Sequence, residues 1–256
     1  MEAIISVKIL GILVCSGFLV GMINASIGVG GSLLAYPLLA YWVEGKTIIG
    51  VLSVIVIVAT AHRLILYRPH FCPQAVKYFL ILGVPSSIAG AYALAFMRVE
   101  VIEIIVGLFL ISMTVSDPRT RRQGSADHKQ AASMKVPGYF IGVGALSGFL
   151  TGLIGSAGFI NTVMLLRAGF VKEGVSVNQA GIALVYSLSK LPVYWEHGII
   201  DPTILLAGTV GSAGSLLGTL AGAALLKRMS VSRFVLLLRV IVIGAGVHLI
   251  ITGFWS

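Results

Sequence analysis

The sequence has little charge and little cysteine. Only 11% of its 256 residues are charged, whereas an ordinary soluble domain carries about 25%. The two cysteines, Cys15 and Cys72, show no CxxC or Cys/His spacing, so they indicate neither a disulfide framework nor a metal site. These shortages exclude an ordinary soluble domain and a small disulfide-stabilised one.

Acidic residues are the scarcest charged group, with nine Asp and Glu against 18 Lys and Arg. All of them lie in predicted loops or near the ends of apolar spans, and none is central to a span. A cation substrate therefore lacks its expected ligand, and the carboxylate relay of many proton-coupled carriers is missing. His62 and His248 lie within apolar spans and could titrate near neutral pH, but a structural role is favoured for both.

Catalytic motifs are also lacking. The sequence contains no GxSxG elbow, no HExxH motif and no paired carboxylates within an apolar span. The stretch GVGG at 28–31 resembles part of a dinucleotide fingerprint, but it lacks the preceding strand and the acidic residue. The sequence therefore predicts no enzyme activity, no catalytic residue, no metal and no cofactor.

Apolar residues, in contrast, make up 57% of the chain, and the mean hydropathy is +1.02. Long apolar windows recur from one end to the other, which predicts an all-α polytopic membrane protein in a lipid bilayer. The first window, after Lys8, resembles a signal peptide, but no A-x-A-like site follows it and it has a partner later in the chain. We therefore expect it to be retained as structure.

The net charge of +9 comes from Lys and Arg in the short connections between apolar spans. That distribution is the positive-inside pattern of membrane proteins rather than a nucleic-acid-binding surface. The longest polar connection, residues 117–135, carries five basic and two acidic residues and is predicted to be a cytoplasmic linker.

The chain contains an internal duplication. Shifting the sequence by 127 positions aligns GFLVGMINASIGVGGSLLAYPLL (17–39) with GALSGFLTGLIGSAGFINTVMLL (144–166), and eight of the 23 positions are identical. The same shift pairs further polar residues downstream: Thr60 with Ser187, Arg63 with Lys190, Tyr67 with Tyr194 and His70 with His197.

Loop charges indicate that the two halves have opposite orientations. The loop at 67–77 is basic, whereas its equivalent at 195–201 is acidic, and two further loop pairs show the same exchange. Parallel halves would place equivalent loops on one side with matching charge. The sequence therefore predicts two inverted-topology repeats, residues 1–116 and 136–256, each with a glycine-broken first segment followed by three transmembrane helices. Secondary transporters often have this architecture, with the substrate site at the repeat interface.

Clustered glycines predict where the first segment of each repeat is broken, since each costs about 1 kcal/mol against Ala within a helix. A break frees N–H groups at the start of the next half-helix, where the helix dipole is positive. Glycine also lets a ligand approach the backbone closely. Two such breaks facing each other suit an anion. The glycines assigned to the breaks are Gly28, Gly30, Gly31, Gly155 and Gly158.

Other glycines show small-xxx-small spacing, which favours close helix packing. They are Gly17, Gly21, Gly83, Gly90, Gly144, Gly148, Gly152, Gly211 and Gly218.

Polar side chains accompany the breaks. Ser32 and Thr162 flank them, and the basic Arg63 and Lys190 lie toward the ends of apolar spans, where ligand binding and snorkelling to the interface are both open. With the break glycines, the predicted substrate-binding side chains are Asn24, Ser26, Thr60, Arg63, Ser156, Asn161, Asn178, Gln179, Ser187 and Lys190.

The repeated glycine motif at 17–39 and 144–166 resembles the signature of the TauE/SafE family of membrane transporters, and the resemblance extends over nearly the whole chain. It implies export of small sulfur-containing anions, sulfite or short organosulfonates, across the bacterial inner membrane. The family signature matches Gly28, Gly30 and Gly31 in the first copy and Gly155 and Gly158 in the second. The second copy is looser, so the two sites are expected to be asymmetric.

The sequence thus predicts a multi-pass inner-membrane exporter of a small oxyanion that works by alternating access, with both termini periplasmic. Two alternatives stay open: an anion channel, and a membrane sensor or assembly subunit without flux.

Overall fold

The computed structural model describes residues 7–28, 31–32, 35, 39, 45–96, 138–155, 158–170, 172–230, 233, 236, 240, 243–244, 247 and 251. Four predicted features lie outside the described residues: Gly30, Ser156, His248 and the linker at 117–135. So do residues 100–116 and most of residues 231–252, where the sequence predicts the last transmembrane helix of each repeat.

Within the described residues every regular element is helical, which confirms the prediction of an all-α protein. The elements in chain order are α1 (Val7–Ile27), α3 (Gly45–Leu66), the short 3-10 helix η2 (Arg68–His70), α4 (Pro73–Phe96), α7 (Tyr139–Ile154), α8 (Gly158–Arg167), α9 (Lys172–Glu196) and α10 (Pro202–Arg228).

Four of these helices, α1, α3, α4 and α10, are long and apolar enough to cross a membrane. The helix α7 is apolar but has only 16 residues, so it is about 24 Å long against a hydrocarbon core of about 30 Å. The helix α9 has 25 residues and is less apolar than the others. Five of its polar residues are buried inside the protein: Ser176, Asn178, Gln179, Ser187 and Lys190.

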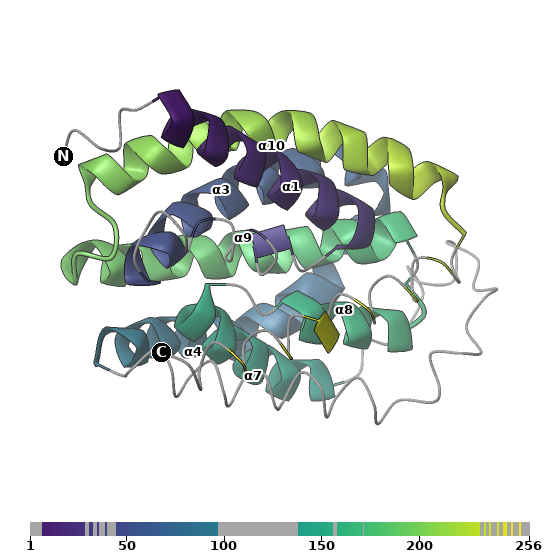
Figure 1. Ribbon diagram of the computed structural model, residues 1–256. Helices are drawn as coiled ribbons and strands as arrows, with labels where there is room; N and C mark the ends of the chain where they lie inside the picture. Colours follow the sequence, from purple (N-terminus) through teal and green to yellow (C-terminus); the bar gives the residue numbers. More distant parts are fainter. Residues whose placement is uncertain are drawn as a thin grey trace.

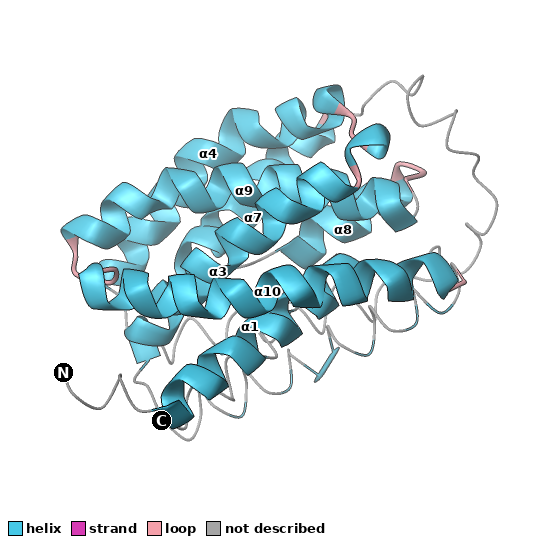
Figure 2. Ribbon diagram, turned by 90° about the horizontal axis from the view of Figure 1, so that it is seen from above, coloured by secondary structure: helices cyan, strands magenta, loops and turns pink. Residues whose placement is uncertain are grey.

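The helices form two close pairs, α1 with α10 and α4 with α7 (Figures 1 and 2). Glycines make these contacts close: a Cβ on Gly21 would lie 2.2 Å from the carbonyl oxygen of Ser215, and a Cβ on Gly148 would lie 2.1 Å from that of Gly83. Along each pair, contacts that lie further toward the C-terminus of one helix also lie further toward the C-terminus of the other, so the two helices of each pair are parallel. The predicted packing role of these glycines is confirmed.

The pairing joins the two halves of the chain. By the sequence alignment α1 corresponds to α7, α3 to α9 and α4 to α10. The helix α1 of the first half packs on α10 of the second half, and α7 of the second half packs on α4 of the first half. Because α1 is equivalent to α7 and α4 to α10, the same contact is made in both directions between the halves. The helices α3 and α9 run between the two pairs and contact each other (Figure 1).

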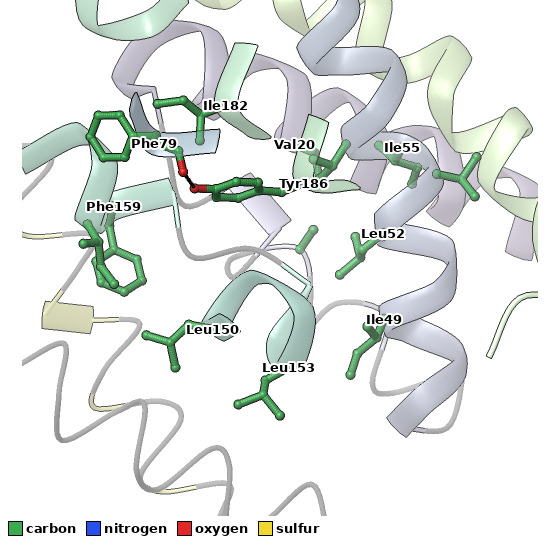
Figure 3. Packing of buried hydrophobic residues seen from close by; sticks show 14 of the residues in the cluster. Val20, Ile49, Leu52, Ile55, Phe79, Leu150, Leu153, Phe159, Ile182 and Tyr186 are labelled. Atoms are coloured by element: carbon green, nitrogen blue, oxygen red, sulfur yellow. Dashed lines mark hydrogen bonds between the residues drawn. The ribbon is translucent and has the colours of Figure 1, made fainter. Parts of the chain in front are cut away.

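Tyr186 connects α9 to the pair formed by α4 and α7. Its side chain is completely buried. Its hydroxyl donates to the carbonyl oxygen of Phe79 at 2.9 Å, and the carbonyl oxygen of Gly144, at 3.1 Å, is a second acceptor within reach. Figure 3 shows the ring among apolar side chains, with the hydroxyl directed at Phe79. A Cβ on Gly83 would lie only 1.9 Å from this hydroxyl, so the contact also requires glycine there.

Tyr186→Phe is expected to reduce stability by about 1 kcal/mol, because a buried carbonyl loses its added donor. Thermal unfolding of the detergent-purified variant measures this. Tyr139→Phe is the control, since Tyr139 is 51% exposed; equal melting temperatures of the two variants would contradict the role given to Tyr186.

Candidate functional site

Each half of the chain has a helix break at the predicted glycine. The helix α1 ends at Ile27 and Gly28 follows with φ +90°, while α7 ends at Ile154 and Gly155 follows with φ +82°. A residue with a Cβ loses about 1–2 kcal/mol in this left-handed region, which explains glycine at both positions. The predicted breaks at Gly28 and Gly155 are therefore confirmed.

The two buried cations hold the ends of the broken helices. Arg63 Nη1 donates to the carbonyl oxygens of Asn24 and, at 3.1 Å, of Gly28. Lys190 Nζ donates to those of Thr151 at 3.3 Å and Gly155 at 3.0 Å. These contacts are equivalent under the 127-residue shift. A cation at the negative end of a helix is favourable.

Both cations are enclosed by protein, with exposed fractions of 1% for Arg63 and 0% for Lys190. Neither snorkels to an interface, so that alternative is excluded by the structure. Each cation instead satisfies carbonyl groups that the end of a helix leaves without partners.

Two tyrosines repeat the same arrangement one turn further along. Tyr194 Oη donates to the carbonyl oxygen of Gly152 at 2.7 Å, and Tyr67 Oη donates to that of Ala25 at 3.5 Å. The sequence alignment pairs these tyrosines, but they were not predicted as site residues. Their equivalent positions in the repeat were the signal that could have identified them.

The second helix of each half also touches the break of the other half. A Cβ on Gly28 would lie 3.9 Å from Ser176 Cα, and a Cβ on Gly155 would lie 3.4 Å from Ile49 Cγ2; Ile49 is the equivalent of Ser176. The start of α9 and the end of α3 therefore meet at the first break, and the start of α3 and the end of α9 meet at the second. It follows that α3 and α9 run antiparallel.

The breaks lie on either side of the middle of α3. Ser53, beside Gly155, and Arg63, beside Gly28, are about 15 Å apart along the helix axis by the helical rise per residue. The helix α8 begins at Gly158, just after the second break, and Thr162 Oγ1 lies 3.7 Å from a Cβ placed on Gly28. The first turn of α8, with Asn161, therefore leads from the second break to the first.

Not all of the predicted backbone donors are free. The N–H of Gly31 donates to Asn24 Oδ1 at 3.0 Å, and the N–H of Gly28 donates to the carbonyl oxygen of Asn24 at 2.9 Å. A Cβ on Gly31 would lie 2.5 Å from the carbonyl oxygen of Val20, so the chain packs closely on α1 after the break. Asn24 thus stabilises the break itself.

Three further predicted side chains have partners within the protein. Asn178 Oδ1 accepts from the N–H of Cys72 at 2.8 Å and its Nδ2 donates to the carbonyl oxygen of Gly174 at 2.7 Å, which ties α9 to the connection between α3 and α4. Ser26 and Thr60 donate to carbonyl oxygens of their own helices. Gly158 is a buried residue at the start of α8.

A second group of buried polar atoms has no hydrogen-bond partner in the part of the chain that the structure describes. From the predicted site they include both amide atoms of Asn161, Gln179 Oε1, Ser187 Oγ and Arg63 Nε; Ser32 Oγ and Thr162 Oγ1 belong to the same group. Buried polar groups are normally paired, so these atoms can accept a ligand without breaking an existing contact. Among the described residues no cluster of His, Cys, Asp or Glu could hold a metal ion.

Comparisons with known proteins identify the family of this chain. The chain matches the family described as "Sulfite exporter TauE/SafE" over residues 13–249. It is 29% identical to a "Probable membrane transporter protein" of Xylella fastidiosa over 252 residues, which cover 92% of each chain. No solved structure matches it significantly. From its repeated glycine breaks and its family match, the chain belongs to the TauE/SafE sulfite exporter family of membrane transporters.

Proposed function

We propose that the protein exports a small sulfur-containing oxyanion, sulfite or a short organosulfonate, across the bacterial inner membrane. One observation carries the proposal: α8, which begins just after the second break, brings Thr162 to the first break, and Thr162 belongs to a group of buried polar atoms without partners in the described part of the chain. Irregular backbone at membrane depth is tolerated where it lines a site within protein. The family match supports the substrate class.

Alternating access between two inverted repeats, residues 1–116 and 136–256, is the mechanism we propose. The antiparallel course of the equivalent helices α3 and α9 and the reciprocal pairing of α1 with α10 and α4 with α7 support it. The basic linker at 117–135 would then be cytoplasmic and both termini periplasmic.

The candidate residues divide into two roles in this proposal. Asn161, Gln179 and Ser187 offer unpartnered polar atoms to the anion. The candidates that are hydrogen-bonded within the protein, such as Asn24 and Asn178, maintain the shape of the breaks. Arg63 and Lys190 also add positive potential, which acts over a longer range in the low-dielectric interior than in water.

Sulfite efflux from vesicles containing the purified protein tests the proposal. We expect flux that saturates with sulfite concentration and exceeds the flux of protein-free vesicles. Flux that rises linearly without saturation would support an anion channel instead. No flux above protein-free vesicles for sulfite or any tested sulfonate would contradict transport and leave a sensor or assembly role.

A further inference from the structure

The two breaks differ in how completely their polar groups are satisfied. At the second break, Lys190 Nζ donates to two carbonyl oxygens, Tyr194 Oη donates to a third at 2.7 Å, and Ser53 Oγ donates to Ile49 at 2.7 Å. The Lys190 ammonium also lies 4.9 Å from the centre of the Tyr194 ring. Lys190, Tyr194 and Ser53 are therefore engaged at this break, and Ser187 Oγ, one turn before Lys190 on α9, has no partner among the described residues.

At the first break, in contrast, some polar atoms have no partner among the described residues. Arg63 Nε, adjacent to the guanidinium nitrogen that contacts Gly28, has no partner among the described residues, and neither has Thr162 Oγ1, which faces Gly28. Gln179 lies one helical turn after Ser176, whose Oγ is 3.5 Å from the carbonyl oxygen of Ala25, so it lies on the same face of α9. Thr162 is 0% and Gln179 3% exposed.

Asn161 completes this group. It lies one residue before Thr162 on the first turn of α8 and is 1% exposed. Neither its Nδ2 nor its Oδ1 has a hydrogen-bond partner among the described residues. Its equivalent in the first repeat is Leu34, and the equivalents of Thr162 and Gln179 are Ala35 and Leu52. The second repeat therefore places Thr162 at the first break, with Asn161 and Gln179 within one helical turn of residues that contact it, and the first repeat has apolar residues at the corresponding positions.

We infer that the substrate site is one-sided: a single anion binds at the first break, held by Arg63 Nε, Asn161, Thr162 and Gln179, while the second break is a structural copy. The inference rests on the proposed function and adds Thr162 to the site. It also defines the ligand as a monovalent oxyanion, preferably one that carries its own O–H group.

Charge and hydrogen-bonding capacity define this ligand class. One guanidinium lies at the first break, and it already shares its charge with two helix-end carbonyls. The other buried cation, Lys190, serves the break on the far side of the middle of α3. A dianion would therefore carry uncompensated charge in a dry interior. Asn161 Nδ2 can donate to an anionic oxygen, whereas Asn161 Oδ1 and Gln179 Oε1 can only accept a hydrogen bond, as from a ligand hydroxyl.

Thermal stabilisation of the purified full-length protein by three probes tests the charge class. Methanesulfonate and 2-hydroxyethanesulfonate are monoanions, and sulfate is a dianion with a similar tetrahedral sulfur group. At equal ionic strength, the two sulfonates are expected to raise the melting temperature and sulfate is not, since a ligand stabilises only the state that binds it. Equal stabilisation by sulfate would overturn the assignment to monovalent anions.

Isosteric substitution tests the position of the site. Thr162→Val and Asn161→Leu are each expected to weaken sulfonate binding about tenfold, which corresponds to about 1.4 kcal/mol. Thr162→Val should leave the ligand-free melting temperature unchanged or higher, because it removes a buried hydroxyl that has no partner. The control is Thr219→Val, because Thr219 Oγ1 is also buried and unpartnered but lies on α10, where its N–H faces Gly21.

The outcomes separate the inference from the proposed function. If the wild-type protein carries sulfite and binds sulfonates, but Thr162→Val and Asn161→Leu bind them as tightly as Thr219→Val does, the one-sided site is wrong and the transport function stands. If the wild-type protein neither binds the sulfonates nor carries sulfite, the proposed function itself is wrong.

Discussion

Gly148→Leu is expected to disrupt the packing of α4 on α7 and to lower the stability of the protein strongly. Any Cβ at this position would lie 2.1 Å from the carbonyl oxygen of Gly83 and 2.8 Å from its Cα. These are backbone atoms, so no side chain can rotate away and the helices themselves must separate. Overpacking of this kind costs about 3 kcal/mol or more, which corresponds to a fall of about 6–12 °C in melting temperature.

Gly142→Leu is the matched control, because Gly142 lies on the same helix and a Cβ there meets nothing within 4 Å. Both substitutions add the same side chain and remove the same backbone freedom. Size-exclusion chromatography and thermal unfolding in detergent compare them. A Gly148→Leu protein as monodisperse and as stable as Gly142→Leu would show that the α4–α7 contact is not required for folding.

Arg63→Met is expected to abolish most transport while changing stability much less. Removing the guanidinium leaves the carbonyl oxygen of Gly28 without its donor, but it also removes a buried charge whose desolvation costs several kcal/mol. The lost hydrogen bond lowers the stability of the protein and the removed buried charge raises it, so the two effects partly cancel. Both effects reduce transport, because the break loses its positive charge and its fixed geometry. Sulfite efflux is expected to fall on the order of a hundredfold, equivalent to about 2.7 kcal/mol.

Arg63→Lys separates the two contributions of Arg63. Lys190 makes the equivalent pair of carbonyl contacts in the second repeat, so a lysine at position 63 should restore the end of α1. It lacks the free Nε–H, so we expect near-normal maximal flux with a higher sulfite concentration at half-saturation. A Lys variant as inactive as Arg63→Met would contradict the capping role, and one with unchanged affinity would contradict the contact between Nε and the ligand.

The helix breaks were predictable from the sequence because their cause is local. Glycine is among the few residues that adopt a positive φ without strain, and Gly28 and Gly155 recur at one spacing within otherwise apolar segments. The same applies to the glycines at helix contacts. Small-xxx-small spacing predicts a surface for close packing, but it leaves the partner open, because any helix with a small-residue face fits. That α1 pairs with α10, and α4 with α7, was found only in the folded chain.

The roles of the polar residues were only partly predictable. Arg63 and Lys190 were identified because a basic residue in an apolar span is costly and therefore rare. The sequence could not show that they donate to the carbonyls of their own repeat, since those carbonyls lie 35 and 39 residues away along the chain. The sequence offers Asn178 and Asn161 alike as candidate ligands of the substrate. The structure separates them, because Asn178 is fully engaged with backbone groups, whereas Asn161 has no partner within the described part of the chain.

By itself the sequence determined that this chain is a duplicated, all-helical membrane protein with a glycine break in each half and few intramembrane charges. Those properties depend on composition and on short-range backbone preferences, and both can be evaluated from each residue and its neighbours in the sequence. The tertiary structure alone decided which polar atoms are consumed in holding the breaks and which remain free. The reason is that hydrogen-bond satisfaction in a dry interior depends on groups brought together from both halves.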